Sequence, residues 1–210
     1  LPRPLMWGSS PAPQRCKPAR RGYSQLVDAR RHLVAALVVG LVFVVVVLAI
    51  TPFGAPRAAP SSAPAGRFSS GRAMDHLRVV AENPRPIGSA GSAAAADHIR
   101  RQLESLGLTP HLQRAEVVSP IDLRVAGVVH NVVGRLPGSD PSRAVLLMTH
   151  YDSVPNSAGV ADDGSGVATL LETARAMRAG PPPRNDIIFL FTDGEEQGLL
   201  GARAFLRDDP

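Results

Sequence analysis

The sequence predicts a three-layer α/β/α domain that follows a single N-terminal transmembrane helix. After residue 70, short apolar runs alternate with segments of helical periodicity, an order typical of helices packed on both faces of a sheet. Two of these runs, residues 144–148 and 187–191, lead into clusters of His, Asp and Glu. Ligands collect at that edge of an open α/β sheet. Earlier in the chain, residues 33–50 carry no charge and no strongly polar side chain.

The positive charge of the chain is confined to its N-terminal tail. The formal net charge is +5, of which residues 1–31 contribute +6 and the remaining residues −1. A domain without a basic surface excess is not expected to bind nucleic acid. Cys16 is the only cysteine, so no disulfide can form within the chain.

Residues 33–50 have the length of a membrane span. An 18-residue helix rises about 27 Å, close to the thickness of a bilayer core. Arg30 and Arg31 precede it, and the positive-inside rule then keeps the N-terminus in the cytoplasm. The domain would lie outside the cytoplasm, beyond a bacterial inner membrane or, in a eukaryote, in the endoplasmic-reticulum lumen. A cleaved signal peptide is the alternative, although its apolar core is usually shorter. A buried core helix would not be apolar all round with arginines beside it.

The sequence therefore predicts four regions. Residues 1–31 form a basic cytoplasmic tail, expected to be disordered. A transmembrane signal anchor over 32–51 is followed by a Pro/Ala/Ser linker over 52–69 that holds the domain off the membrane. Residues 70–210 form the N-terminal part of the α/β domain. Because the sequence starts with Leu and stops soon after the second acidic cluster, we expect a fragment of a longer chain.

Periodicity and turn residues assign the elements of this domain. The first helix follows Ser69 with Met74, Leu77 and Val80 inward, and Gly107 occupies the left-handed position that ends the second helix. The expected helices are about 70–81, 92–106, 167–179 and 198–206. The expected strands are 110–118, 128–135, a buried strand at 144–148, and a continuously apolar strand at 186–192 of the kind found inside parallel sheets.

His150 and Asp152 are the first candidate site residues. Residues i and i+2 of an extended strand share a face, so Asp152 could accept the second ring N–H of a metal-bound His150. The same sequence pattern would also arise from a structural histidine at a strand end beside an aspartate in a turn, with no metal bound.

Two further acidic pairs complete the candidate site. Asp162 precedes a helix start, where a carboxylate can bridge two divalent ions about 3.5–4 Å apart, whereas Asp163 or Ser165 could cap that helix. Glu195 and Glu196 repel each other unless a cation offsets their charge. One can ligate a metal while the other takes the proton of a metal-bound water that attacks a carbonyl.

The motifs T-H-Y-D-S-V, A-D-D-G-S-G and F-T-D-G-E-E-Q-G-L-L-G-A resemble the zinc aminopeptidase family (clan MH, aminopeptidase Y type). P-R-P-I-G-S before the second helix is similar too. The nearest likeness is to membrane-anchored, Fxna-like endoplasmic-reticulum metallopeptidases and their bacterial relatives. The resemblance covers residues 70–210 and implies a zinc-exopeptidase-like fold, here truncated, acting on peptide substrates.

The resemblance also implies residue roles. His150 would bind one zinc, Asp162 would bridge two, and Glu196 would bind the other. Glu195 would be the general base, and Asp152 would support His150. A cis peptide would join Asp162 to Asp163. The family takes one more Asp and one more His from further along the chain, so we expect this fragment alone to bind zinc weakly and to be inactive.

Three other functions remain open. A glutaminyl cyclase shares H-Y-D-S and D-G-E-E but uses a single zinc. A metallo-carboxypeptidase or deacylase of the H-x-D-x-V-P type usually places its bridging Asp further from the His than the 12 residues between His150 and Asp162. A non-catalytic ectodomain on the same fold would need none of the ligands or Glu195.

Overall fold

The computed structural model describes residues 20–50, 57–119, 124–140 and 142–208. The chain divides into two compact units, Leu1–Pro56 and Arg57–Pro210. The first unit contains the long helix α1, and the second contains every strand and the other helices.

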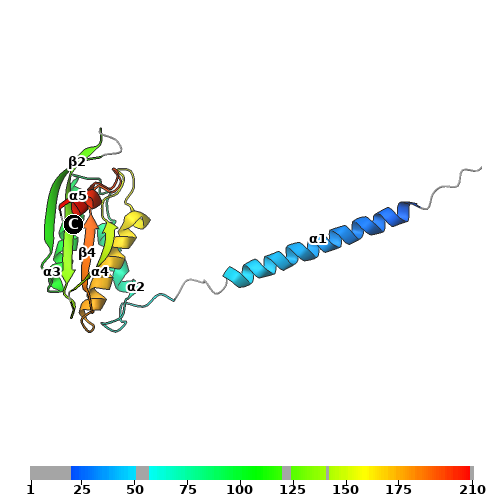
Figure 1. The fold of residues 1–210 in the computed structure, drawn as a ribbon, viewed down its shortest axis with the longest axis horizontal. Coiled ribbons are helices and arrows are strands. Elements are labelled where there is room, and N and C mark those ends of the chain that lie inside the picture. The colour runs from blue at the N-terminus through cyan, green and yellow to red at the C-terminus, as the bar shows by residue number, and fades with distance from the viewer. Residues whose placement is uncertain (1–19, 51–56, 120–123, 141, 209–210) are drawn as a thin grey trace, which may run out of the picture. The chain divides into compact units, whose positions relative to one another are not determined.

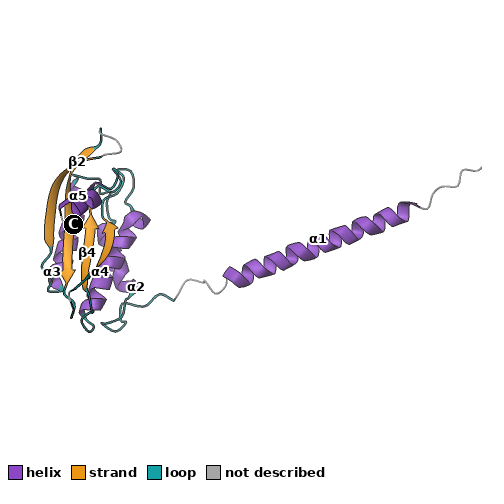
Figure 2. Ribbon diagram, in the orientation of Figure 1, coloured by secondary structure: helices purple, strands orange, loops and turns teal. Residues whose placement is uncertain are grey.

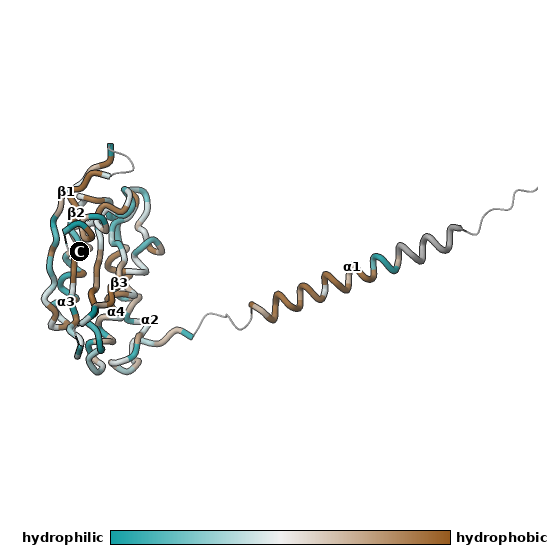
Figure 3. The backbone as a smooth tube through the Cα atoms, viewed as in Figure 1, coloured by the Kyte–Doolittle hydropathy of each residue, from teal (hydrophilic) through white to brown (hydrophobic). Residues whose placement is uncertain are grey.

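Helix α1 runs from Arg20 to Ile50. Its segment Ala29–Ile50 is long and apolar enough to cross a membrane by length and composition, and Figure 3 shows it as hydrophobic along most of its length after a hydrophilic start. The expected disorder of the tail is wrong for residues 20–31, which are helical. Once a helix has formed, each added residue costs little, so it can extend beyond the apolar run. The expectation for residues 1–19 lies outside the described residues.

The second unit is built on one mixed sheet with the order β1-β2-β4-β3 (Figures 1 and 2). Its strands are β1 (His111–Val118), β2 (Ala126–Leu136), β3 (Ala144–His150) and β4 (Asp186–Thr192). β2 pairs antiparallel with both β1 and β4, whereas β3 and β4 are parallel. The strand predicted at 186–192 is confirmed, and all of its residues except the half-buried Ile188 are buried.

Helices cover both faces of this sheet, which confirms the predicted α/β/α layering. The helices are α2 (Ser70–Val80), α3 (Ala90–Ser105), α4 (Ser165–Arg178) and α5 (Leu200–Asp208). On one face Ile99 and Leu103 of α3 and Leu171 of α4 join the same buried core as Phe189 and Phe191 of β4. A second core lies on the other face, where Leu200 and Ala204 of α5 meet Ala115, Val117 and Val129. Side chains that alternate along each strand supply these two cores.

The helix ends follow the signals in the sequence. The Ser69 hydroxyl accepts the N–H of Arg72 at the start of α2, and Ser89 accepts the N–H of Ser92 at the start of α3. Gly107 has φ 74° after α3, the left-handed conformation expected there. Met74 is exposed, so its predicted inward orientation is wrong, and Ala73 is buried instead.

The prediction that residues 144–148 are buried is wrong. β3 is the last strand in the sheet order, and Val145, Leu146 and Met148 are 42%, 43% and 54% exposed. Only Leu147 packs against the main core. Apolar composition alone does not distinguish a central strand from an edge strand.

Part of the expected linker is bound to the domain. The hydroxyl of Ser69 donates to the carbonyl of Pro60 at 2.8 Å, and the Arg72 guanidinium donates to the carbonyls of Ser61, Ala63 and Arg67. These bonds hold residues 60–67 against the start of α2. The remainder of the proposed linker includes residues 52–56, which lie outside the described residues.

Candidate metal centre

The candidate site lies where β3 and β4 end side by side. The two strands are parallel, with His150 paired to Thr192. The N–H of Tyr151 donates to the carbonyl of Thr192 at 3.0 Å, which extends the pairing one residue further. Parallel strands end at the same edge, so Asp152 and the Glu195–Glu196 pair are brought to one place.

His150 lies at the centre of this site. Its Nε2 atom is 3.0 Å from Oδ1 of Asp162 and 3.8 Å from Oε2 of Glu195. Its Nδ1 atom is buried and lies 3.4 Å from Oδ1 of Asp152, without a well-formed hydrogen bond. The structure therefore brings together the side chains of four predicted site residues.

The neighbouring carboxylates determine the charge of His150. Burial alone would lower the pKa of this imidazole, but Asp152 first, and then Glu195 and Asp162, raise it to about 9. In the metal-free protein the imidazolium thus offsets part of the repulsion among these carboxylates. A cation at the same place would have the same electrostatic effect.

Asp152 connects the two acidic segments. Its side chain is fully buried, and its two oxygens accept the backbone N–H groups of Glu195 at 3.0 Å and of Glu196 at 3.1 Å. These two bonds fix the backbone of Glu195 and Glu196 in the segment that follows β4. Burial is the main cause that raises the pKa of Glu195, with nearby carboxylates adding to it and His150 opposing it. A raised carboxyl pKa suits a group that accepts a proton near neutral pH.

Asp162 and Asp163 have separate positions. The peptide between them is cis, as the family resemblance implied. Asp163 caps α4, because its Oδ1 accepts the N–H of Gly166 at 2.8 Å while Oδ2 accepts the Thr149 hydroxyl. Ser165 does not cap the helix and donates to the carbonyl of Ala161. The side chain of Asp162 is 80% exposed and faces His150.

The donor set suits zinc in kind, because imidazole nitrogen and carboxylate oxygen are its usual ligands together with thiolate. The buried Nδ1 of His150 faces Asp152, so Nε2, which faces Asp162 and Glu195, is the nitrogen that would bind the metal. Within the residues that the structure describes, however, no group of three or more His, Cys, Asp or Glu is arranged to hold an ion. His150 and Asp162 are in place, and the Glu196 side chain does not complete the set.

Sequence comparison matches this part of the chain to a known family. Residues 131–210 match the sequence profile of Peptidase family M28. We refer to residues 131–210 as the M28 segment. The family resemblance drawn from the motifs is thereby confirmed, and the match supports a metallopeptidase-like function. The M28 segment contains β3, β4 and all five predicted site residues, His150, Asp152, Asp162, Glu195 and Glu196.

Two curated relatives extend the match towards the N-terminus. The chain is 33% identical over 142 residues to leupeptin-inactivating enzyme 1 of Streptomyces exfoliatus, covering 65% of this chain and 31% of that protein. It is 48% identical over 157 residues to a vacuolar membrane protease of Yarrowia lipolytica, covering 64% of this chain and 16% of that protein. The chain thus spans about a third or less of these relatives.

Solved structures share the fold. A glutaminyl cyclase of Porphyromonas gingivalis superimposes with a TM-score of 0.58 at 26% identity, over 68% of this chain and 54% of that one. An aminopeptidase from Aneurinibacillus gives 0.60 at 15% identity, over 69% and 67%. The second likeness supports the fold alone.

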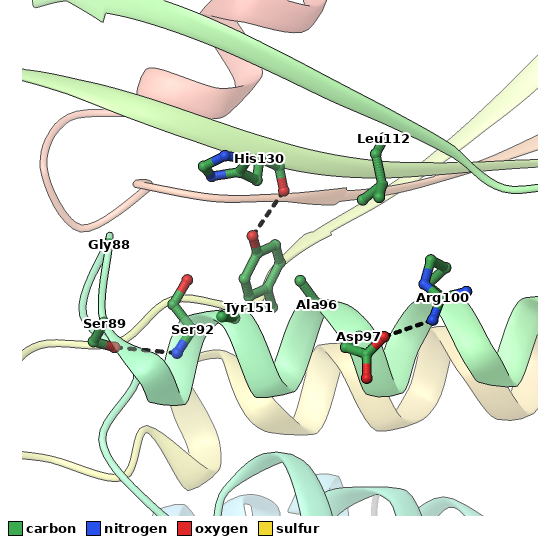
Figure 4. Close-up of a pocket in the computed structure, with 10 residues that line it drawn as sticks. Gly88, Ser89, Ser92, Ala96, Asp97, Arg100, Leu112, His130 and Tyr151 are labelled. Atoms are coloured by element: carbon green, nitrogen blue, oxygen red, sulfur yellow. Dashed lines mark hydrogen bonds and ion pairs between the residues drawn. The ribbon is translucent and has the colours of Figure 1, made fainter.

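A pocket of about 300 Å³ lies beside the M28 segment, between α3 and the sheet. Figure 4 shows Tyr151 on its wall, with the hydroxyl donating to the carbonyl of His130 at 2.7 Å. None of the five predicted site residues lines this pocket. The side chain of Tyr151 therefore points away from His150 and anchors the strand end from the opposite side.

Sequence reasoning missed two buried charged residues near the site. Asp193 is fully buried and accepts the N–H of His130, and burial first, then Asp152, raises its pKa to about 6. Arg85 is 1% exposed and belongs to the P-R-P-I-G-S segment, which contributes to the family resemblance but in which the sequence predicted no role for the arginine. Burial lowers the pKa of Arg85, while the charges of Asp152 and Asp163 oppose that change. The signals in the sequence were the position of the arginine between two prolines and the resemblance of this segment to the family motif.

Proposed function

We propose that the protein is a zinc-dependent aminopeptidase that removes N-terminal residues from peptides. The observation that carries this proposal is the convergence of Asp162 and Glu195 on Nε2 of His150, at 3.0 and 3.8 Å. His150, Asp162 and Glu196 would hold the metal, and a complete site would take two zinc ions. Zinc supplies a Lewis acid that polarises a carbonyl and lowers the pKa of water.

Glu195 performs the proton transfer in this proposal. It takes a proton from the attacking water, whose oxygen bonds to the scissile carbonyl carbon. The carbon–nitrogen bond then breaks, and the proton passes to the departing amine. The Asp152 carboxylate accepts the backbone N–H of Glu195, which keeps Glu195 in place, and the same carboxylate orients His150. General-base assistance of this kind contributes about 10²–10⁴-fold to the rate.

The test uses the complete protein that contains this sequence, loaded with zinc, and a peptide with an unblocked N-terminal apolar residue. Glu195→Gln should lose at least about 10²-fold in kcat and keep its zinc. Glu116→Gln, at an exposed position on β1, is the matched control and should keep wild-type turnover. Equal turnover in wild type and Glu195→Gln would favour a non-catalytic ectodomain.

A second candidate is a glutaminyl-cyclase-like enzyme with one zinc, favoured by the 26% identity to the P. gingivalis enzyme. The two candidates differ in product and in metal content. A peptide with N-terminal Gln would lose ammonia and cyclise in the second case, and would release free glutamine in the first. Mass spectrometry of the product separates them.

We also propose that α1 anchors the protein in a membrane, with residues 1–31 in the cytoplasm, the span at 32–51 and the peptidase domain on the other side. The linker at 52–69 would connect them, with its residues 60–67 bonded to the start of α2. The apolar stretch of α1 and the basic residues before it support this topology. Cys16 offers a direct test. A membrane-impermeant maleimide should label it only after cells are opened, with Cys16→Ser as the control for other thiols. Labelling of Cys16 in intact cells would reverse the orientation.

A further inference from the structure

The buried guanidinium of Arg85 donates hydrogen bonds to four backbone carbonyls. The Nε atom donates to the carbonyl of Tyr151 at 2.6 Å, and Nη2 donates to that of Gly159 at 3.2 Å. Nη1 donates to the carbonyls of Val80, at 3.0 Å, and Ala158. These four contacts use the rigid donor fork that distinguishes arginine from lysine.

The backbone of Arg85 is fixed as well. Its N–H donates to the hydroxyl oxygen of Ser153 at 2.9 Å, and its carbonyl accepts the N–H of Ser153 at 3.2 Å. The Ser153 hydroxyl in turn donates to the carbonyl of Ser157 at 2.9 Å. The position of the guanidinium is therefore set from both ends of the residue.

The carbonyls that Arg85 binds belong to the two segments that carry the candidate ligands. Tyr151 lies between His150 and Asp152. Ala158 and Gly159 lead directly into Val160–Gly164, which contains Asp162. One side chain from outside the M28 segment thus connects the end of β3 with the loop before α4.

There is little free space around this contact. Gly159 has φ 54°, and a Cβ there would come within 2.5 Å of the Asp162 carbonyl oxygen and 3.1 Å of Nη2 of Arg85. On the other side, the Tyr151 ring is held by its hydroxyl bond to His130 (Figure 4). The Tyr151 backbone is consequently fixed between its own side chain and the guanidinium. Replacement of Arg85 would leave buried carbonyls without donors, which is costly in a closed interior.

We propose that Arg85 is a positioning residue that sets the separation between His150 and Asp162 by binding the carbonyls of Tyr151 and Gly159. The inference rests on the proposed metal function, because its consequence is the geometry of a metal site. Lysine should not replace it, since a single ammonium group cannot reach carbonyls that diverge from a planar fork.

The experiment compares Arg85→Met and Arg85→Lys with Arg72→Met in the complete protein. Arg72 is a matched control, because its guanidinium also binds several backbone carbonyls, those of Ser61, Ala63 and Arg67, away from the site. Zinc affinity is measured by competition with a chelating dye, and the visible absorption of the Co²⁺-substituted protein reports ligand geometry. Circular dichroism establishes that each variant is folded at the temperature used.

Both Arg85 variants should lose about 10–100-fold in zinc affinity, as residues that orient metal ligands do, and should change the Co²⁺ spectrum. Arg72→Met should lower thermal stability and leave both metal readouts unchanged. If the Arg85 variants do not fold, Ser153→Ala tests the same connection. It removes the acceptor for the Arg85 N–H while the guanidinium stays, and it should weaken zinc binding severalfold.

Arg85 variants, or Ser153→Ala in their place, that lose stability but bind Co²⁺ and Zn²⁺ like the wild type would overturn the inference. Wild-type protein that binds neither metal would contradict the proposed function itself. The two failures are thus distinguishable.

Discussion

One carboxylate oxygen of Asp152 accepts the backbone N–H of Glu195 at 3.0 Å. The other oxygen accepts the N–H of Glu196 at 3.1 Å, so a single buried side chain fixes the start of the loop that carries both glutamates. The same carboxylate lies 3.4 Å from Nδ1 of His150. The Asp152 carboxylate therefore contacts both Glu195, the general base that we propose, and His150, which we propose as a metal ligand.

Asp152→Asn tests this relationship. An amide keeps one oxygen but turns its NH₂ group towards a backbone N–H donor, so one glutamate loses its acceptor. Zinc affinity should fall about 10–100-fold, and turnover should fall with it. Competition titration and steady-state kinetics measure the two effects. Asp75→Asn, at an exposed position on α2, is the control and should change neither. Unaltered zinc affinity in Asp152→Asn would remove Asp152 from the proposed site.

Local sequence signals placed the expected helices and strands within about two residues of their observed bounds. The apolar run at 186–192 gave β4 residue for residue, and Gly107 marked the end of α3 because its φ of 74° suits glycine. The order of the strands was not predictable in this way. β2 intervenes between β1 and β4, and β3 lies at the edge, and both facts depend on pairing between residues far apart in the sequence. The expected burial of β3 was wrong for that reason.

The candidate site shows the same division. His150, Asp162 and Glu195 were found from motifs and converge within 4 Å. Arg85 was missed because its bonds go to backbone carbonyls, and a carbonyl has the same chemistry whichever residue carries it. Its partners lie 66 and 74 residues away. Periodicity and motif spacing cannot predict contacts between residues so far apart in the sequence, whereas the folded structure shows them directly.

Zinc should stabilise the folded protein through His150 and Asp162. Ligands that bind only the native state raise stability by about 2.7 kcal/mol at a free concentration of 100 times Kd. Thermal unfolding of the complete protein should therefore shift upwards with zinc and return with a chelator. His150→Ala should abolish most of the shift, whereas His111→Ala, at an exposed position on β1, should retain it. An equal shift in both variants would place the zinc elsewhere.

Glu172 on α4 anchors the N-terminal part of the domain. It is fully buried and accepts the N–H of Ser69 at 2.8 Å and bonds from Arg72 and Arg175. Burial acts to raise its pKa, but these donors outweigh it and lower that pKa below the ordinary value. Its stabilisation is thus complete above the unfolded pKa and is lost as the pH falls through the lower folded pKa.

Glu172→Gln should reduce the free energy of unfolding by about 3–5 kcal/mol, because it leaves two guanidinium groups without their carboxylate. Urea unfolding at neutral pH measures this loss. Glu104→Gln is the matched control, since Glu104 pairs with Arg100 at the surface of α3. Its removal should cost no more than about 1 kcal/mol. Equal effects of the two substitutions would show that the buried network contributes nothing special.

A pair of histidines lies between α2 and α3 and makes the stability of the folded domain depend on pH. His76 Nδ1 and His98 Nε2 are 3.4 Å apart, and the rings meet edge to face. Burial is the main cause that lowers the pKa of both. For His76, Glu172 and Asp75 oppose this effect and Arg175 adds to it, whereas His76 itself lowers the pKa of His98. The folded protein therefore holds fewer protons here than the unfolded chain just below about pH 6.5.

Their contribution to stability is complete above that pH and is lost as the pH falls through the folded pKa values. Each proton taken up on unfolding changes the free energy of unfolding by about 1.4 kcal/mol per pH unit. Urea unfolding at about pH 7.5 and about pH 5.5 should show wild type losing stability towards acid, and His98→Gln losing less. His111→Gln, an exposed control on β1, should follow wild type. An identical acid slope in His98→Gln would assign the dependence to other groups, with Glu172 the first to examine because its pKa is also displaced.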